Sequence, residues 1–393
     1  MLSPDPVNTR SASPLGSSKR VAHLTTVHSP FDVRIFHKEC KSLARAGYDV
    51  TLIACHDKDE TKDGVCIRAV PKEPKRLLRM TRGVRNVYRE AVRINADLYH
   101  FHDPELLPAG LLLRLRGKRV VYDVHEDVSA DIASKQYIPK GFRWFVAGAI
   151  SMIEALASRI LSAVTPATPR IATRFASRRL PAVLLSNYPV LEEFRVPDHD
   201  TWSRKSMAIA YVGVITRSRC IQEMTQAMSL LPESLGATLK LVGNFSPPSL
   251  AGELAAINGW KRTQVLGILD RGRVAGVLAE VRAGLVVLKA TQAFVDSVPI
   301  KMFEYMCAGI PVIASNFPAF AETVNGAKCG LLVDPDDPQG IARAIEYVLT
   351  HTEEAEAMGK RGREAVLSKY NWANEEHKLF QLYRTLLDCS CAG

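Results

Sequence analysis

The sequence has little of what marks a secreted, disulfide-bonded or membrane-spanning protein. Its eight cysteines are scattered over 393 residues without a C-x-x-C pair, which favours neither a disulfide framework nor a zinc site. No apolar run reaches the ~18 residues that a membrane-spanning helix needs. The first twenty residues are rich in Ser and Pro and lack the apolar core of a secretory signal. We expect a disordered tail over residues 1–19 and a reducing, cytoplasmic location.

Several catalytic motifs are also missing. The sequence contains no GxxxxGK[ST], no GxGxxG after a strand, no HExxH and no GxSxG, so the ATPase, dehydrogenase, zincin and α/β-hydrolase interpretations lose their main support. Two D-x-D triplets, at Asp57/Asp59 and Asp334/Asp336, fall in polar stretches and are interpreted as solvated. We therefore expect no metal and no cofactor.

The net charge of +10 is held unevenly. Residues 1–190 carry 30 Lys and Arg against 18 Asp and Glu, whereas residues 191–393 carry 21 against 23. A basic half suggests an anionic partner, either nucleic acid or an anionic membrane surface. Since nucleic-acid-binding motifs are absent and aromatic residues are few, we expect no nucleic-acid partner.

Short β-branched runs alternate with segments of helical period along most of the chain. In the first half the predicted strands are Val21–Val27, Tyr48–Ala54, Asp97–Phe101, Arg119–Tyr122, Ile160–Val164 and Ala182–Leu185. In the second half they are Met207–Val212, Thr238–Val242, Gln264–Leu266, Gly284–Leu288, Pro311–Ala314 and Gly330–Val333. This alternation predicts the α/β class, with parallel sheets covered by helices on both faces.

The polar stretch 188–206 has no clear apolar period and predicts a linker between two doubly wound domains. We place the first domain at residues 20–187 and the second at 207–370, and expect the last helix, over 371–393, to return to the first domain. In open α/β sheets ligands bind beyond the carboxyl ends of the strands, so the predicted site is the cleft between the domains.

The segment FVDSVPIKMFEYMCAGIPVIA, residues 294–314, holds the most informative pattern. Pro299 after Ser297 suits the start of a helix, whose exposed N–H groups attract phosphate. Two carboxylates flank that start, Asp296 outside the helix and Glu304 inside it, and each can accept hydrogen bonds from sugar hydroxyls. From spacing alone, a capping Asp and a solvated helical Glu explain the pattern equally well.

This segment resembles the carboxyl-terminal signature of the family 4 retaining glycosyltransferases, whose usual motif is E-x7-E. HSPFDVRIFHKE, YHFHDPELL, VVYDVHED, YVGVITRSR and YNWANEEHKLF are also similar to that family, in order. The resemblance implies the GT-B architecture, two facing Rossmann-like domains with the acceptor on the first and the nucleotide-sugar donor on the second. It implies transfer with retention of configuration and without a metal.

Carried over by position, Asp296 contacts the donor sugar and Glu304 the nucleotide ribose. Val298, Pro299, Ile300 and Lys301 form the backbone segment whose amides face the donor. Of the family's G-R-x4-K-G pattern this sequence keeps Gly213 but lacks the arginine. Arg219 stands at the lysine position, and Arg217 is a possible substitute for the missing arginine. A solvated basic loop is the alternative for both arginines.

Other candidates lie in loops that follow predicted strands. His125 suits a contact with donor sugar or acceptor, although a lone loop histidine is more often structural. Gly243 and Asn244 leave room for a base or ribose, with a plain turn as the alternative. The loop holding His28 and Asp32 is expected to face donor phosphate or acceptor. We take Asp296, Glu304, His125 and Arg219 as the candidate catalytic set.

The segment 75–93, KRLLRMTRGVRNVYREAVR, predicts a basic amphipathic helix. Arg79, Arg82 and Arg89 are the candidate lipid-facing residues, which suits a peripheral place on the inner face of the cell membrane. An ordinary surface helix packed on the first domain is the alternative.

The sequence as a whole predicts a glycosyltransferase that uses a nucleotide-sugar donor, with UDP favoured over GDP. Its acceptor is expected to be a hydroxyl of a saccharide or of a polyprenyl-diphosphate-linked saccharide. Two alternatives stay open: a sugar-nucleotide epimerase of the same fold, and a catalytically weak nucleotide-sugar-binding partner of a larger assembly.

Overall fold

The computed structural model describes residues 18–125, 159–176, 180–194, 202–295 and 297–388, together with Gly148, Met152 and Ala157. The predicted tail, most of the stretch 126–158 and part of the predicted linker therefore lie outside the described residues. Within the described part of the chain, no helix is long and apolar enough to cross a membrane.

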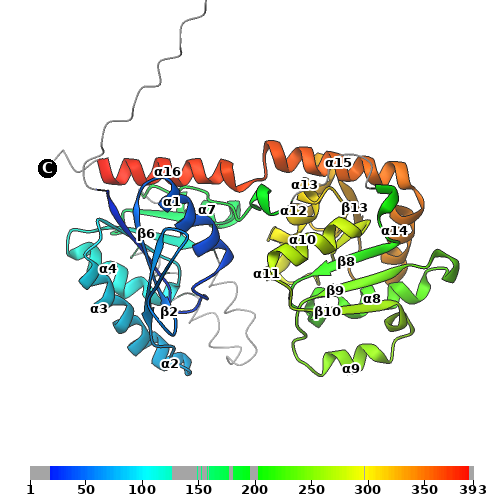
Figure 1. Ribbon diagram of the computed structural model, residues 1–393, viewed down its shortest axis with the longest axis horizontal. Helices are drawn as coiled ribbons and strands as arrows, with labels where there is room; N and C mark the ends of the chain where they lie inside the picture. The colour runs from blue at the N-terminus through cyan, green and yellow to red at the C-terminus, as the bar shows by residue number, and fades with distance from the viewer. Residues whose placement is uncertain are drawn as a thin grey trace, which may run out of the picture.

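The strands form two separate sheets (Figure 1). The first sheet has the spatial order β3 (Glu60–Lys62), β4 (Val65–Val70), β2 (Asp49–Cys55), β1 (Arg20–Leu24), β5 (Leu98–Phe101), β6 (Arg119–Val124) and β7 (Ala163–Pro166). The second has the order β10 (Thr263–Gly267), β9 (Thr238–Val242), β8 (Ala208–Val212), β11 (Ala283–Val286), β12 (Val312–Ser315) and β13 (Gly330–Val333). The predicted fold class is confirmed.

The strand prediction is wrong in two places, because β3 and β4 were not predicted and one predicted strand barely pairs. β3 pairs antiparallel with β4 through a two-residue turn in which Asp63 has φ 50° and Gly64 φ 79°, so the first sheet is not wholly parallel. The Asp63–Gly64 pair is a strong hairpin signal that the strand prediction did not use. The predicted strand Ala182–Leu185 makes only one bridge, from Ala182 to Val164 of β7.

Helices cover both sheets (Figure 1). In the first domain a π-helical segment (η1, Val33–Cys40) runs into α1 (Lys41–Arg45), and a second one (η2, Arg79–Gly83) joins α2 (Arg76–Leu78) to α3 (Val84–Ile94). α4 (Leu107–Leu115) and α7 (Pro169–Ala176) follow. The second domain has α8 (Ile221–Leu230), α9 (Leu250–Ala255), α10 (Arg271–Glu280), α11 (Gln292–Val295), α12 (Ile300–Cys307), α13 (Pro318–Ala327), α14 (Pro338–Thr350) and α15 (Thr352–Ser368).

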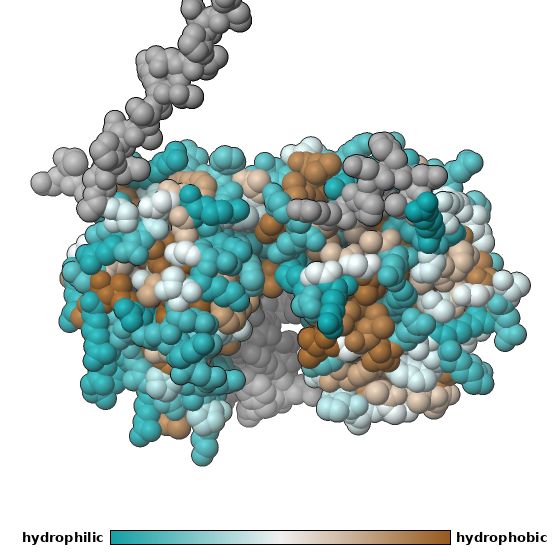
Figure 2. Space-filling model, in the orientation of Figure 1, coloured by the Kyte–Doolittle hydropathy of each residue, from teal (hydrophilic) through white to brown (hydrophobic). Residues whose placement is uncertain are grey.

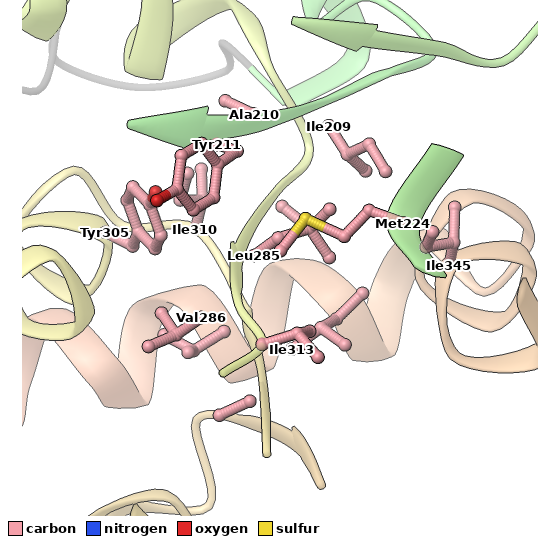
Figure 3. Packing of buried hydrophobic residues seen from close by; sticks show 14 of the residues in the cluster. Ile209, Ala210, Tyr211, Met224, Leu285, Val286, Tyr305, Ile310, Ile313 and Ile345 are labelled. Carbon is pink, nitrogen blue, oxygen red and sulfur yellow. The ribbon is translucent and has the colours of Figure 1, made fainter. Parts of the chain in front are cut away.

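The core of the second domain packs α12 directly onto the sheet (Figure 3). Tyr305 of α12 lies against β11, where a side chain at Gly284 would overlap its ring, and its hydroxyl accepts a hydrogen bond from the Val212 amide at 2.9 Å. Ile310 and Ile313 continue this buried layer. The packing fixes the start of α12 beside the carboxyl end of β8, which matters for the site below.

The last helix, α16 (Trp372–Asp388), packs on the first domain, while α15 packs on the second (Figure 1). Trp372, Leu379 and Tyr383 are buried among side chains of η1, β1 and β2. The Trp372 indole donates to Ser42 Oγ at 2.9 Å, and the Trp372 amide donates to the Pro189 carbonyl at 2.9 Å. The two passages of chain between the domains, near Pro189 and near Trp372, therefore lie side by side.

We predict that Trp372→Ala weakens the first domain, because it empties a buried ring position and removes the bond to Ser42. Truncation of a buried Trp costs about 3–5 kcal/mol, so the thermal midpoint should fall by several degrees. Leu367→Ala, at a position 50% exposed near the end of α15, is the matched control and should stay near wild type. Equal midpoints for the two variants would contradict the packing described here.

Candidate functional site

A cleft of about 860 Å³ lies between the two domains. The first domain contributes the loop after β1, the residue after β6 and the start of α7, and the second contributes the starts of α12 and α13. Its lining residues include His28, Asp32, Arg34, His125, Arg170, Ser297, Val298, Ile300, Phe303, Glu322 and Lys369. The structure thus brings together His28, Asp32, His125, Val298 and Ile300 of the predicted site.

On the first-domain wall, His125 and His28 are hydrogen-bonded to each other. Their Nε2 atoms are 3.1 Å apart, and His125 Nδ1 lies 3.0 Å from Asp123 Oδ2. A carboxylate behind one ring nitrogen orients an imidazole and favours a proton on that nitrogen. This pair can therefore hold or pass a proton at the cleft.

Asp32 caps the π-helical segment η1. Its carboxylate accepts from the amides of Arg34 and Ile35 at 2.8 and 2.9 Å and lies 3.6 Å from His28 Nδ1. Burial alone would raise the pKa of Asp32, but the neighbouring His28 and the two amide hydrogen bonds outweigh burial and hold the pKa well below its ordinary value. Asp32 is therefore a fixed negative charge that positions His28.

Behind this wall lies a buried ion pair that sequence reasoning missed. Arg34 donates from Nε and Nη2 to the two oxygens of Asp123 at 2.9 and 2.6 Å, and from Nη1 to the Leu185 carbonyl at 3.0 Å. Both residues are at most 4% exposed. Burial opposes the charge on Asp123, but Arg34 and the histidine bonds keep its pKa well below the ordinary range. Two signals were available in the sequence: Arg34 is a charged residue in a segment of helical period, and Asp123 is a charged residue directly after the predicted strand Arg119–Tyr122.

On the second-domain wall, α12 begins one residue later than the sequence predicts. Pro299 is the N-cap rather than the first helical residue, and Ser297 Oγ donates to the Phe294 carbonyl instead of capping α12. Pro299 has no N–H, so within Val298–Lys301 only Val298, Ile300 and Lys301 have amides to offer a ligand. The rigid packing of Tyr305 holds these amides in place.

Two cationic side chains converge at the carboxyl end of β8. A Cβ built on Gly213 would lie 3.0 Å from Lys301 Nζ and 3.2 Å from Arg219 Nη1. Lys301 is buried, its Nζ is 3.9 Å from the Tyr211 ring centroid, and among the described residues Nζ has no hydrogen-bond partner. Burial and the neighbouring Arg219 lower the pKa of Lys301 well below its ordinary value. An unpartnered amine beside a guanidinium is a site prepared for an anion.

Glu304 lies inside α12 with its side chain 7% exposed, and it is not solvated. Arg271, at the first residue of α10, donates from Nη2 to Glu304 Oε1 at 3.0 Å. Arg271 also donates from Nε to Glu193 Oε2 at 2.7 Å. Sequence reasoning missed Arg271, for which no spacing signal exists.

None of the other predicted site residues that the structure describes is among those lining the cleft, including Arg219, Pro299, Lys301 and Glu304. Arg217 is exposed and forms an ion pair with Glu253 of α9. Gly243 has φ 144°, and a side chain there would collide with the Gly213 carbonyl, so glycine is required by the close approach of two strand ends. Asn244 is exposed, and its carbonyl accepts from the Ile215 amide at 2.8 Å. Asp296 lies outside the described residues.

Family models match both halves of the chain. Residues 198–365 match the model "Glycosyl transferases group 1", and residues 33–186 match "Glycosyltransferase Family 4". The first match covers α12 and the strands around it, and the second covers the His28–His125 wall from Val33 onward.

Curated relatives are similar over shorter stretches. A Mycobacterium tuberculosis protein named GDP-mannose-dependent alpha-(1-6)-phosphatidylinositol monomannoside mannosyltransferase is 37% identical over 90 residues, 23% of each chain. An Escherichia coli O-antigen chain mannosyltransferase B is 23% identical over 233 residues, 56% of each chain. The chain thus spans about a quarter of the length of the first of these relatives and about half of the second.

Solved structures of the same architecture cover nearly the whole chain. A sucrose-phosphate synthase from Thermosynechococcus elongatus has a TM-score of 0.77 at 20% identity and covers 95% of this chain and all of its own. HepE of Anabaena, solved in complex with UDP, has a TM-score of 0.70 at 14% identity, covering 94% of this chain and all of its own. The two matched models together cover most of the chain and place it in the family 4 glycosyltransferases, and the solved structures show that it has the GT-B fold.

Proposed function

We propose that this chain transfers a sugar from a nucleoside-diphosphate donor to a hydroxyl acceptor in the interdomain cleft. The observation that carries the proposal is the convergence of Lys301 Nζ and Arg219 Nη1 on Gly213, next to the start of α12. A buried amine without a hydrogen-bond partner is costly, and a donor diphosphate would supply that partner. The amides of Val298, Ile300 and Lys301 add a positive helix end to the same site.

In this proposal the second domain stabilises the leaving group. As the bond between the sugar and the diphosphate breaks, negative charge grows on the diphosphate and meets donors that are already in place. Lys301 and Arg219 provide the positive charge that a divalent metal provides in other diphosphate sites, so we propose transfer without a metal at the donor. Retention of configuration is proposed from the family resemblance.

The first domain would hold the acceptor. His125 and His28 face the cleft, and the Asp123 carboxylate orients the His125 ring. An imidazole in this position can hydrogen-bond an acceptor hydroxyl or a donor-sugar hydroxyl. We propose a saccharide acceptor, free or linked to a polyprenyl diphosphate.

Glu304 is the candidate ribose ligand, and the structural neighbour HepE, solved with UDP, favours a uridine nucleotide. We propose that Glu304 binds the ribose, and that the donor is a UDP-sugar. GDP-mannose is the second candidate, because the Mycobacterium tuberculosis relative is named for it. A ribose at Glu304 must share the carboxylate with Arg271 or displace it.

The basic helical segment α2–α3 is the proposed membrane face. Val87 and Ala91 of α3 are buried against the first sheet, so that side of the helix is structural. Leu77 and Met80 are exposed by 74% and 46%, and Arg82 and Arg89 are also exposed. Figure 2 shows mostly hydrophilic residues over this region. Arg79 is a weaker candidate, because it binds Glu105 at 2.8 Å.

We predict that Lys301→Met weakens donor binding without lowering the thermal stability of the free protein. Met keeps the length of the side chain and removes a desolvated amine, so the thermal midpoint of the free protein should stay or rise. Affinity for a nucleotide sugar should fall about 10–100-fold, because charge-assisted bonds to the diphosphate are lost. Titration calorimetry measures the affinity for the nucleotide sugar. Lys261→Met, at an exposed lysine, should change neither quantity, and undiminished donor affinity in Lys301→Met would refute the proposed diphosphate site.

Glu304→Gln should weaken UDP and a UDP-sugar alike, by about tenfold, while leaving inorganic diphosphate binding unchanged. The ribose hydroxyls lose their charged acceptor and keep only a neutral amide oxygen, whereas Lys301 and Arg219 are retained. Titrating UDP, GDP and their sugar conjugates in parallel identifies the base that binds more tightly. Glu364→Gln, at an exposed position on α15, is the control. If UDP affinity survives in Glu304→Gln, the ribose assignment is wrong.

Charge reversal at Arg82 and Arg89 should abolish sedimentation with anionic phospholipid vesicles at low salt. Both side chains lie on the exposed side of the helix, so folding should be unaffected. Reversal of Arg343 and Lys360, two exposed charges of the second domain, is the matched control and should leave sedimentation intact. Equal sedimentation of both double variants would rule out α2–α3 as the docking face.

A further inference from the structure

The core of the first domain holds a cluster of polar side chains with no role in the proposed transfer. We call it the imidazole cluster; it consists of His23, Glu39, His100 and His102. His23 lies on β1 and His100 beside it on β5, in register, while His102 directly follows β5 and Glu39 projects from η1. All four are at most 1% exposed. One ligand-type atom from each lies within 4.8 Å of the others.

The Glu39 carboxylate is the unusual member. Its Oε2 lies 3.8 Å from His23 Nδ1, 3.6 Å from His100 Nδ1 and 4.0 Å from His102 Nε2. Within the described part of the chain neither of its oxygens has a hydrogen-bond partner, although Arg34 Nε is 3.1 Å from Oε1. The three separations between Oε2 and the histidine nitrogens are too long for hydrogen bonds but suit atoms that share a common partner between them. A buried carboxylate left in this state is costly.

Each imidazole is anchored through its other ring nitrogen. His102 Nδ1 lies 3.0 Å from Asp123 Oδ2, and His100 Nε2 lies 3.1 Å from Thr165 Oγ1. His23 Nε2 lies 3.1 Å from the Tyr383 hydroxyl. Imidazoles that bind a metal are typically held in this way, with an oxygen on the nitrogen that faces away from the ion. The arrangement leaves His23 Nδ1, His100 Nδ1 and His102 Nε2 turned toward Glu39.

Counting hydrogens supports a missing cation. Hydrogen bonds join Asp123, His102, His23, Tyr383, His100 and Thr165 into a closed ring of six contacts. Six contacts need six hydrogens, but three neutral imidazoles, one phenol and one hydroxyl supply five, because a carboxylate supplies none. As long as the three imidazoles are neutral, one contact of the ring therefore places two lone pairs against each other.

A cation removes this shortfall. If it binds His23 Nδ1, His102 Nε2 and His100 Nδ1, the His23–His102 and His100–Tyr383 contacts no longer need a hydrogen. The ring hydrogens of the three neutral imidazoles then serve Asp123, Tyr383 and Thr165. Glu39 becomes the fourth ligand, and its orphaned oxygen gains a partner.

We propose that the imidazole cluster is a structural site for one divalent transition-metal cation of the zinc type, with His23, Glu39, His100 and His102 as ligands. Three imidazoles and one carboxylate are a ligand set that Zn²⁺ accepts, and a site closed to solvent is typical of structural rather than catalytic zinc. The ion would join β1, β5 and η1. It would also fix the chain of contacts from His102 through Asp123 to His125 at the cleft. It is separate from the donor site, for which transfer without a metal is proposed.

Metal content of the full-length chain tests this proposal directly. Protein purified without a histidine tag or chelators should carry about one equivalent of a transition metal by plasma mass spectrometry. Because the site is closed, the metal must enter during folding. Protein refolded with Zn²⁺ should therefore melt several degrees above protein refolded with a chelator. Refolding with Co²⁺ should give visible absorption bands of a site with nitrogen and oxygen ligands.

Variants provide the specificity control. Glu39→Gln and His100→Gln should each lose most of the bound metal and the Zn²⁺-dependent rise in melting temperature, whereas His351→Gln, an exposed histidine of the second domain, should retain both. Wild-type protein that holds less than about one-tenth of an equivalent and melts identically after refolding with Zn²⁺ or chelator would overturn the proposal. Metal that persists undiminished in Glu39→Gln would overturn it as well.

Discussion

The docking of α16 on the first domain is the constraint on which the cleft depends. Trp372 bonds to Pro189 and Ser42, and Glu375 Oε2 accepts from the Ser186 amide at 2.8 Å, so the outgoing and returning passages of chain are tied together at one place. The carboxyl ends of the two sheets face each other across this double crossing. These few buried contacts hold the two crossings together.

The charged groups on the two sides of the cleft differ in whether they have partners within the protein. On the first wall, Asp123 is almost fully compensated by Arg34 and by ordered imidazoles, so its charge orients neighbours rather than attracting ligands. On the second-domain side, Lys301 Nζ lies over the Tyr211 ring without a hydrogen-bond partner among the described residues, and Arg219 stands beside it. Burial and Arg219 lower the pKa of the Lys301 amine in the free protein, and an anion bound beside it would favour the charged form. The asymmetry fits a rigid acceptor wall and a donor wall that is completed by its ligand.

The sequence predicted the sheets well because their strands are short β-branched runs separated by helical periods. It also identified the start of α12 and the loop histidine His125. It assigned Lys301 only a backbone amide, although the structure makes its side-chain nitrogen the more informative atom. His23, His100 and Glu39 were not recognised, because a sheet covered by helices on both faces buries both sides of its strands. Alternation of polar and apolar residues then no longer separates surface from core.

Arg34, Asp123 and Arg271 were missed for a different reason. Their roles depend on partners 33 to 151 residues away, as in the contacts of Arg271 with Glu304 and of Arg34 with Leu185. No local pattern encodes such a pairing. The Arg271 contact also changes how Glu304 should be understood: a ribose hydroxyl must compete with a guanidinium that Glu193 holds in place. On the proposed assignment, a ribose hydroxyl would share the Glu304 carboxylate with Arg271 or displace the guanidinium, which Glu193 would still hold.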